Sequence, residues 1–138
     1  KIIMNNLENL FIPTELSQQL IELGFDKNEC IAGRNILGHI RLKFAITNEG
    51  HIISWDKYDK ETPLILWDQA IDWFDTKGIF ITVRTYYIDT VIEYGFTIKY
   101  GTEYITKYEF NSKYEANKNA IVKAIALYES FLKEIENE

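Results

Sequence analysis

The stretch IFITVRTYYIDTVIEYGFTIKYGTEYITKYEF, residues 79–110, decides the fold that the sequence predicts. Apolar or aromatic residues alternate with other residues along it, and a period of two is typical of β-strands. Three strands fit this pattern, at Ile79–Tyr87, Val91–Tyr100 and Glu103–Phe110. The short polar or glycine-containing breaks between them predict an antiparallel sheet of consecutive strands.

A register for these strands follows from keeping apolar side chains together on one face of the sheet. A two-residue loop after the first strand places Ile81 opposite Ile98, and a three-residue loop after the second places Ile98 opposite Tyr104. The other face is then mainly polar. It is expected to carry Thr82, Arg84, Tyr86, Glu93, Thr97, Lys99, Glu103, Lys107 and Glu109.

Two glutamates of this polar face meet in the predicted register. Glu93 falls opposite Glu109, with Arg84 and Lys107 diagonal to them. Carboxylates about 5 Å apart can have split pKa values and share acid/base chemistry. A solvated ion network explains the same four residues, and no nucleophile accompanies them. The polar face is therefore predicted to bind a partner through Arg84, Tyr86, Glu93, Lys107 and Glu109, and no catalytic residue is assigned.

A helix and a β-hairpin are predicted before this sheet. In the phrase FIPTELSQQLIELGF, Thr14 is a candidate N-cap and Gly24 is a candidate left-handed terminator. The phrases HIRLKFAI and HIISWDKY flank the turn signal TNEG, and their alternating residues predict a hairpin with Ile46 opposite His51.

Two further helices flank the predicted sheet along the chain. Pro63 is expected to open the first, which contains the segment LWDQAIDWF. At helical spacing its tryptophans and phenylalanine share one arc, while Asp68 and Asp72 share the opposite arc. Ser112 and Glu115 form a capping box at the start of the last helix. An aromatic pocket around the two aspartates is therefore not expected, because the segment is an amphipathic core helix.

The predicted element order is α-β-β-α-β-β-β-α, which indicates the α+β class. A chain of 138 residues, with 46% hydrophobic and 26% charged residues, can bury one hydrophobic core. We therefore expect a single domain over residues 1–138, with an antiparallel sheet and helices packed on one face. The helix-then-strands order occurs twice without a repeat at the level of residues.

Charge and hydropathy exclude some classes of function and indicate the cellular compartment. The net charge of −6 disfavours general phosphate binding, which depends on clustered lysines and arginines. No apolar run approaches the roughly 18 residues of a membrane span, and the first residues do not have the pattern of a secretory signal. Since Cys30 is the only cysteine, no intramolecular disulfide can form. These features predict a cytoplasmic protein.

Neither a metal nor a cofactor site is predicted. His39 and His51 are the only histidines, and they lie about seven residues apart along the predicted hairpin, or roughly 23 Å. They cannot share a metal ion within that hairpin. No catalytic signature surrounds Cys30, so we expect a small buried thiol.

The order helix, three strands, helix resembles the topology of a double-stranded RNA-binding domain. The segment NSKYEANKNAIVKAI stands where that family begins its second helix with a phosphate-binding Lys-Lys-x-Ala-Lys pattern. Only Lys113 and Ala116 match, because Tyr114 and Asn117 replace the other lysines. Topology alone does not carry function. Nucleic-acid binding through Lys113 and Lys118 is therefore the alternative prediction.

Three phrases, FIPTELSQQLIELGFD, PLILWDQAIDWF and YEANKNAIVKAIALYESFL, resemble a group of small proteins from phages and mobile elements of Bacteroidetes-type bacteria. This chain departs from the group's pattern by the insertion of Ile65-Leu66 after Pro63-Leu64. The resemblance implies a context but no activity or cofactor. We therefore expect a non-enzymatic accessory protein that binds a host or phage protein, with homo-oligomerisation left open.

Overall fold

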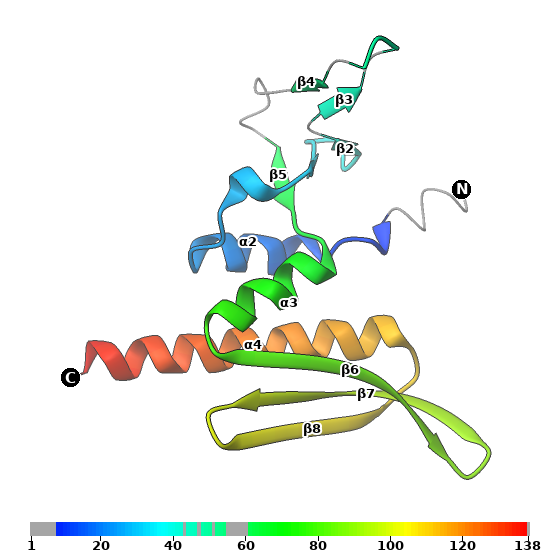
Figure 1. Ribbon diagram of the computed structural model, residues 1–138, viewed down its shortest axis with the longest axis vertical. Coiled ribbons are helices and arrows are strands. Elements are labelled where there is room, and N and C mark those ends of the chain that lie inside the picture. The colour runs from blue at the N-terminus through cyan, green and yellow to red at the C-terminus, as the bar shows by residue number, and fades with distance from the viewer. Residues whose placement is uncertain (1–7, 43, 47, 51, 55–60, 138) are drawn as a thin grey trace. The chain divides into compact units, whose positions relative to one another are not determined.

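The computed structural model describes residues 8–42, 44–46, 48–50, 52–54 and 61–137, without the side chains of residues 44–46 and 52–54. Contacts group the chain into two compact units, Lys1–Leu66 and Trp67–Glu138, called here the N-terminal and C-terminal units. Both combine helices with antiparallel sheets, which confirms the predicted α+β class and the order of its main elements (Figure 1). Two short strands, β1 and β5, are added to that order.

In the N-terminal unit, helix α2 spans Thr14–Glu22, and its Leu16, Ser17 and Leu20 are buried. The helix ends as the sequence predicted. Gly24 has a left-handed φ of 117°, and the Phe25 N–H donates to the Leu20 carbonyl at 2.9 Å. This bond closes the last turn in the manner of a Schellman motif, which the left-handed conformation of Gly24 makes possible.

The start of α2 differs from the prediction. The N-cap is Pro13, and no side chain caps the helix there. The Thr14 hydroxyl, which was predicted to cap it, instead accepts a hydrogen bond from Arg34 Nε at 3.1 Å. A partner twenty positions away along the chain cannot be recognised from the local sequence, so the capping prediction was wrong.

Short strands follow α2 and a single turn of 3-10 helix, η1 (Lys27–Glu29). The first antiparallel sheet has the order β2-β1-β5, and the second joins β3 to β4. Their bounds are β1 Ala32–Arg34, β2 Ile40–Leu42, β3 Phe44–Ile46, β4 Ile52–Ser54 and β5 Thr62–Leu64. With three residues each, these strands are too short for a clear alternating pattern.

Two predictions for this region were wrong. Ile46 lies opposite Ile52, whereas His51, its predicted partner, falls outside the described residues. Pro63 lies inside β5 and does not open a helix. Because β5 is at the edge of its sheet, a residue without a backbone N–H, such as Pro63, is tolerated there.

A small core holds the N-terminal unit together. Phe11, Ala32 and Leu64 are buried against one another, and Ile31, Ile40 and Leu66 pack on them. The buried Ser17 hydroxyl accepts a hydrogen bond from the Ile65 N–H at 3.2 Å. The Cys30 side chain is buried, as predicted.

The C-terminal unit is a three-stranded antiparallel sheet with two helices on one face, as predicted (Figure 1). Its strands are β6 (Ile79–Ile88), β7 (Val91–Tyr100) and β8 (Glu103–Phe110), in the order β6-β7-β8. Helix α4, Lys113–Glu136, contacts all three strands, and helix α3, Trp67–Thr76, contacts β6 and α4. The buried face of α4 consists of Ala116, Ala120, Ile121, Ala124 and Ile125. Its alanines recur every four residues, so they lie on one side of the helix and allow close approach to the sheet.

Both helices confirm the sequence patterns. In α3 the side chains of Ala70 and Phe74 are buried while Asp68 and Asp72 are exposed. The Ser112 hydroxyl caps α4 by accepting a hydrogen bond from the Glu115 N–H at 3.1 Å. In the part of the chain that the structure describes, neither these nor any other helix is long and apolar enough to cross a membrane.

Candidate binding surface

The outer face of the C-terminal sheet is the side turned away from α3 and α4. Its β6 and β7 residues follow from a register that confirms the prediction, with Ile81 opposite Ile98 and Val83 opposite Phe96. Phe96 and Ile98 are buried under the helices, so the alternate positions point outward. These outward positions are Phe80, Thr82, Arg84, Tyr86, Glu93, Gly95, Thr97 and Lys99.

The register between β7 and β8 differs from the prediction by one residue. Ile98 lies opposite Ile105, because Tyr100 pairs with Glu103 and only Gly101-Thr102 form the loop. Gly101 has a left-handed φ of 57°, which suits the first position of a two-residue hairpin loop. The three-residue loop was therefore wrong. A slip of one residue turns each β8 side chain to the other face.

Contacts on the outer face agree with this register. The hydroxyl oxygens of Thr97 and Thr106 are 3.2 Å apart. The Lys99 ammonium lies 5.7 Å from the centre of the Tyr104 ring, where a cation–π attraction is expected. In the three-residue-loop register Glu103 would lie opposite Lys99, but Tyr104 occupies that position. Tyr104, Thr106 and Tyr108 thus replace Glu103 and Lys107 on the outer face.

A β-bulge opposite Gly95 interrupts the regular pairing of β7 with β8 near the last residues of β8. One residue, Gly95, lies between Tyr94 and Phe96 on β7, whereas two residues lie between their partners Phe110 and Lys107 on β8. A Cβ on Gly95 would lie 2.5 Å from the Lys107 carbonyl oxygen, so only glycine fits without a backbone shift. The bulge places both Phe110 and Ile105 beneath α4, although an odd spacing of five would separate them in a regular strand.

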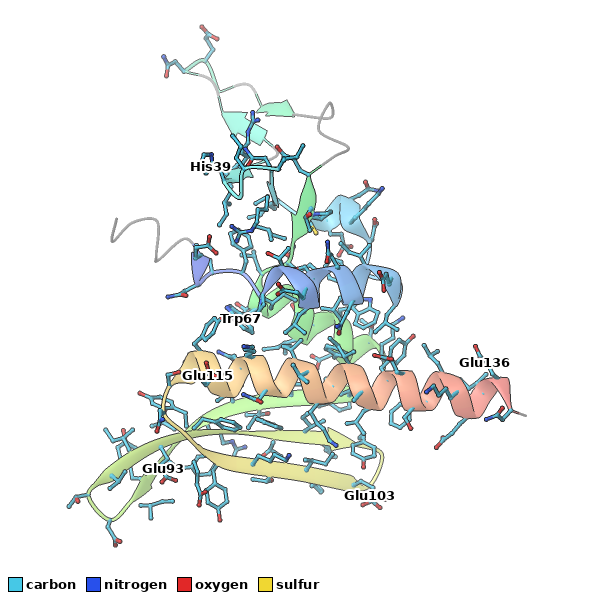
Figure 2. All side chains as sticks on the ribbon, turned by 180° about the vertical axis from the view of Figure 1, so that it is seen from behind. His39, Trp67, Glu93, Glu103, Glu115 and Glu136 are labelled. Atoms are coloured by element: carbon cyan, nitrogen blue, oxygen red, sulfur yellow. The ribbon has the colours of Figure 1, made fainter. Side chains whose placement is uncertain are left out.

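The predicted pairing of Glu93 with Glu109 is wrong. Glu93 lies opposite Tyr86 of β6, and the last β8 residue pairs with Tyr94. Glu109 belongs to the bulge and has a left-handed φ of 81°. Figure 2 shows Glu93 toward the turn that joins β6 and β7, and Glu103 at the other end of the sheet, where β7 turns into β8. The register that suggested shared acid/base chemistry is therefore absent.

The remaining predicted contact residues divide between two faces. Arg84 is exposed on the outer face, where Tyr86 and Glu93 are partly buried. One oxygen of Glu93, Oε2, is buried without a hydrogen-bond partner among the described residues. Lys107 points to the other side of the sheet. The structure thus brings together three of the five predicted residues.

The predicted outer face included Tyr86 but not the other aromatic side chains that lie there. Phe80, Tyr104 and Tyr108 expose 48%, 64% and 50% of their surface. The rings of Tyr86 and Tyr108 lie 5.9 Å apart, across the bulge. Two glycines could have revealed this arrangement: Gly101 at a short loop and Gly95 inside a strand, where a bulge is common.

Lys107 contributes to a shallow hollow of about 420 Å³ between β8 and α4. Its floor is mainly apolar, and Lys123 approaches it from the helix. The lining consists of Phe96, Lys107, Phe110, Asn119, Val122, Lys123 and Ala126. The Asn119 side-chain N–H donates to the Glu115 carbonyl at 2.8 Å, within the helix itself. The hollow is open to solvent and forms a groove beside helix α4.

The lysines of the nucleic-acid alternative lie near the start of α4. Lys113 is the first helical residue and is exposed, whereas Lys118 is partly buried. Glu115 stands between them in the first turn. This end of the helix therefore carries charges of both signs, unlike the lysine cluster of the double-stranded RNA-binding family.

The strongest ionic contact described in the N-terminal unit is structural. Arg34 donates to both carboxylate oxygens of Glu8, at 2.9 and 2.7 Å. This bond lowers the pKa of the Glu8 carboxyl from its ordinary value, chiefly by favouring the charged form. Arg34 also donates to the Gly38 carbonyl at 2.6 Å. The arginine therefore ties the segment before α2 to strand β1 and its following turn.

No group of three potential metal ligands occurs among the described residues, and His39 is exposed. The predicted separation of His39 from His51 lies outside the described residues, because His51 is not among them. No protein-family model, curated protein or solved structure matches the chain.

Proposed function

We propose that this chain is a non-enzymatic protein-binding module that contacts its partner through the outer face of the β6-β7-β8 sheet. The exposed aromatic side chains of Phe80, Tyr104 and Tyr108 carry the proposal. Grouped aromatic surface in water is a feature of interaction sites, and tyrosine concentrates binding energy at protein interfaces.

The sheet holds these aromatic residues in place before any partner binds. Tyr108 packs beside Tyr86, and Tyr104 lies under the Lys99 ammonium. A tyrosine has few rotatable bonds, so ordering it at an interface costs little conformational entropy. A preorganised aromatic surface therefore supports binding without a large rearrangement.

Charge on the outer face indicates the character of the partner. Arg84 and Lys99 lie on this face with one acidic residue of β7, the partly buried Glu93, in a chain whose net charge is −6. Local positive charge beside aromatic residues suits an apolar partner surface with acidic groups near it, because complementary charges favour the correct encounter. The fitting partner is thus a protein with an acidic rim around an apolar centre.

The expected setting follows from the sequence. The resemblance to phage and mobile-element proteins supports an accessory role in the bacterial cytoplasm, with a host or phage protein as the partner. In this proposal neither a cofactor nor a membrane takes part. Nucleic-acid binding is the less favoured alternative, because Lys113 and Lys118 are separated by an acidic residue and differ in exposure.

The experiment captures a partner on the immobilised full chain from bacterial lysate and then measures its affinity in purified form. Tyr104→Ala is expected to weaken binding at least about tenfold, since truncating a tyrosine that is a binding hot spot costs about 2 kcal/mol or more. Tyr87→Ala is the matched control. Tyr87 is 77% exposed on the opposite face of β6, and its loss should leave the affinity nearly unchanged.

Two results would contradict the proposal. One is capture of no stoichiometric partner by the wild-type chain. The other is a partner whose affinity is unaffected by Tyr104→Ala, or falls as much with Tyr87→Ala. Circular dichroism of both variants checks that the sheet is intact before their affinities are compared.

A further inference from the structure

The edge of β6 that does not pair with β7 can support a second kind of interaction. This interaction does not depend on the proposed function. On one side β6 pairs with β7 along all of Ile79–Ile88. On its other side no described strand pairs with it. Figure 1 shows the hairpin end of β6 and β7 extending beyond the start of α4. An unpaired strand edge presents free N–H and C=O groups, which are a template for another strand.

The two edges of this sheet differ in how they oppose such pairing. The β8 edge carries three charges and the Gly95 bulge, and both features discourage a neighbouring strand. The β6 sequence, IFITVRTYYI, has neither proline nor glycine, and Arg84 is its only charge. It pairs with β7 without a bulge. β6 is therefore the edge that remains open to augmentation.

The hairpin geometry identifies which backbone groups of β6 are free. Ile88 and Val91 close a two-residue loop, so they form a hydrogen-bonded pair. In an antiparallel ladder, hydrogen-bonded and non-hydrogen-bonded pairs alternate. The even-numbered residues of β6 therefore bond to β7. The N–H and C=O groups of Ile81, Val83 and Thr85 point to the open edge.

We propose that β6 pairs with β6 of a second copy of this chain, antiparallel and with Val83 on the two-fold axis. The chain then forms a symmetric dimer with a continuous six-stranded sheet. In a two-fold interface the same strand must complement itself. In this register the free groups of Val83 meet their symmetry mates, and those of Ile81 meet those of Thr85.

Side chains select both the partner and the register. With Val83 on the axis, Phe80 of one copy lies opposite Tyr86 of the other, and this aromatic pair occurs twice. Arg84 lies opposite Thr82, so the arginines of the two copies do not meet. A shift of the axis to Arg84 would place two like charges opposite each other. The absence of acidic residues from β6 also spares two acidic chains from repulsion at their contact.

Sedimentation velocity over a range of concentrations, together with amide hydrogen exchange by NMR, tests this dimer on the full chain. We expect reversible dimerisation. The amides of Val83 and Thr85 should gain protection as concentration rises, whereas those of Thr82 and Arg84 should be protected at every concentration by their bonds to β7. This odd–even difference reports edge pairing directly.

A substitution at the axis supplies the second readout. Val83→Pro removes an N–H from the open edge without removing a bond to β7, and proline is tolerated on edge strands. It should weaken the dimer at least about tenfold. Val83→Ala is the matched control, since it shortens the same side chain but keeps the N–H, and it should dimerise nearly as the wild type does.

Three results would overturn the dimer. These are a monomer at concentrations up to about 1 mM, a folded Val83→Pro chain that dimerises like the wild type, and Val83 and Thr85 amides that exchange at unprotected rates at every concentration. If Val83→Pro does not fold, the exchange pattern of the wild-type chain decides by itself.

Discussion

Gly95 is the residue on which the shape of the outer face depends. A Cβ at this position would lie 2.5 Å from the Lys107 carbonyl oxygen and 2.8 Å from a carbon of the Tyr86 ring. The ring can turn away, but the carbonyl belongs to the backbone of β8. Both the bulge and the position of the Tyr86–Tyr108 pair therefore require a residue without a side chain.

Gly95→Ala is expected to lower the free energy of unfolding by about 1–3 kcal/mol, as overpacking does in a close-packed site. Urea denaturation followed by far-UV circular dichroism measures this change. Thr97→Ala is the control on the same strand and face, and the loss of its contact with Thr106 should cost less than about 1 kcal/mol. A Gly95→Ala chain as stable as the wild type would contradict this account of the bulge.

At the scale of elements, the helices and strands that were predicted correctly are the long ones and those whose contacts are local in sequence. The ten-residue strands β6 and β7 and the helix caps at Gly24 and Ser112 were predicted correctly, because periodicity and capping are local signals. The three-residue strands β1 and β5 were not predicted, since they contain less than two periods of alternation. The register of β8 failed over one loop residue, and that single error moved Lys107 and the tyrosines to the wrong faces.

Arg34 joins elements that are far apart in sequence, and its bond to Glu8 makes a pH-dependent prediction. The folded-state pKa of Glu8 lies below its ordinary value. The stability that the bond contributes is therefore fully present above the unfolded pKa of about 4.3. It is lost as pH falls through the lower folded-state pKa. Glu8→Gln should thus reduce stability at neutral pH and have a smaller effect in acid.

Urea unfolding of the wild type and of Glu8→Gln at pH 7 and near pH 3 measures the difference. Glu22→Gln is the matched control, because Glu22 is an exposed glutamate of α2. Its effect on unfolding should be small at both pH values. A Glu8→Gln chain that is equally destabilised at both pH values would show that the charge of the carboxylate is not what stabilises the N-terminal unit.

At the scale of the whole molecule, the order of elements was a better guide to fold than to function. Helix, three strands and helix in the C-terminal unit match the order found in double-stranded RNA-binding domains, but a shared order of elements leaves surface chemistry open. The aromatic outer face depends on the β8 register, and the open β6 edge depends on which strands pair. Neither can be read from composition, whereas the acidic net charge can.

That charge leads to the last prediction, which concerns nucleic acid. At a net charge of −6, with Lys113 and Lys118 separated by Glu115, the chain lacks the dense positive surface that releases counterions from phosphates. The full chain should pass unretained through immobilised RNA and DNA at about 150 mM salt. The double variant Lys113→Glu, Lys118→Glu should behave in the same way. If the wild type is retained and the double variant is not, a phosphate-binding site lies at the start of α4. Nucleic-acid binding would then replace protein binding by the outer face as the proposed function.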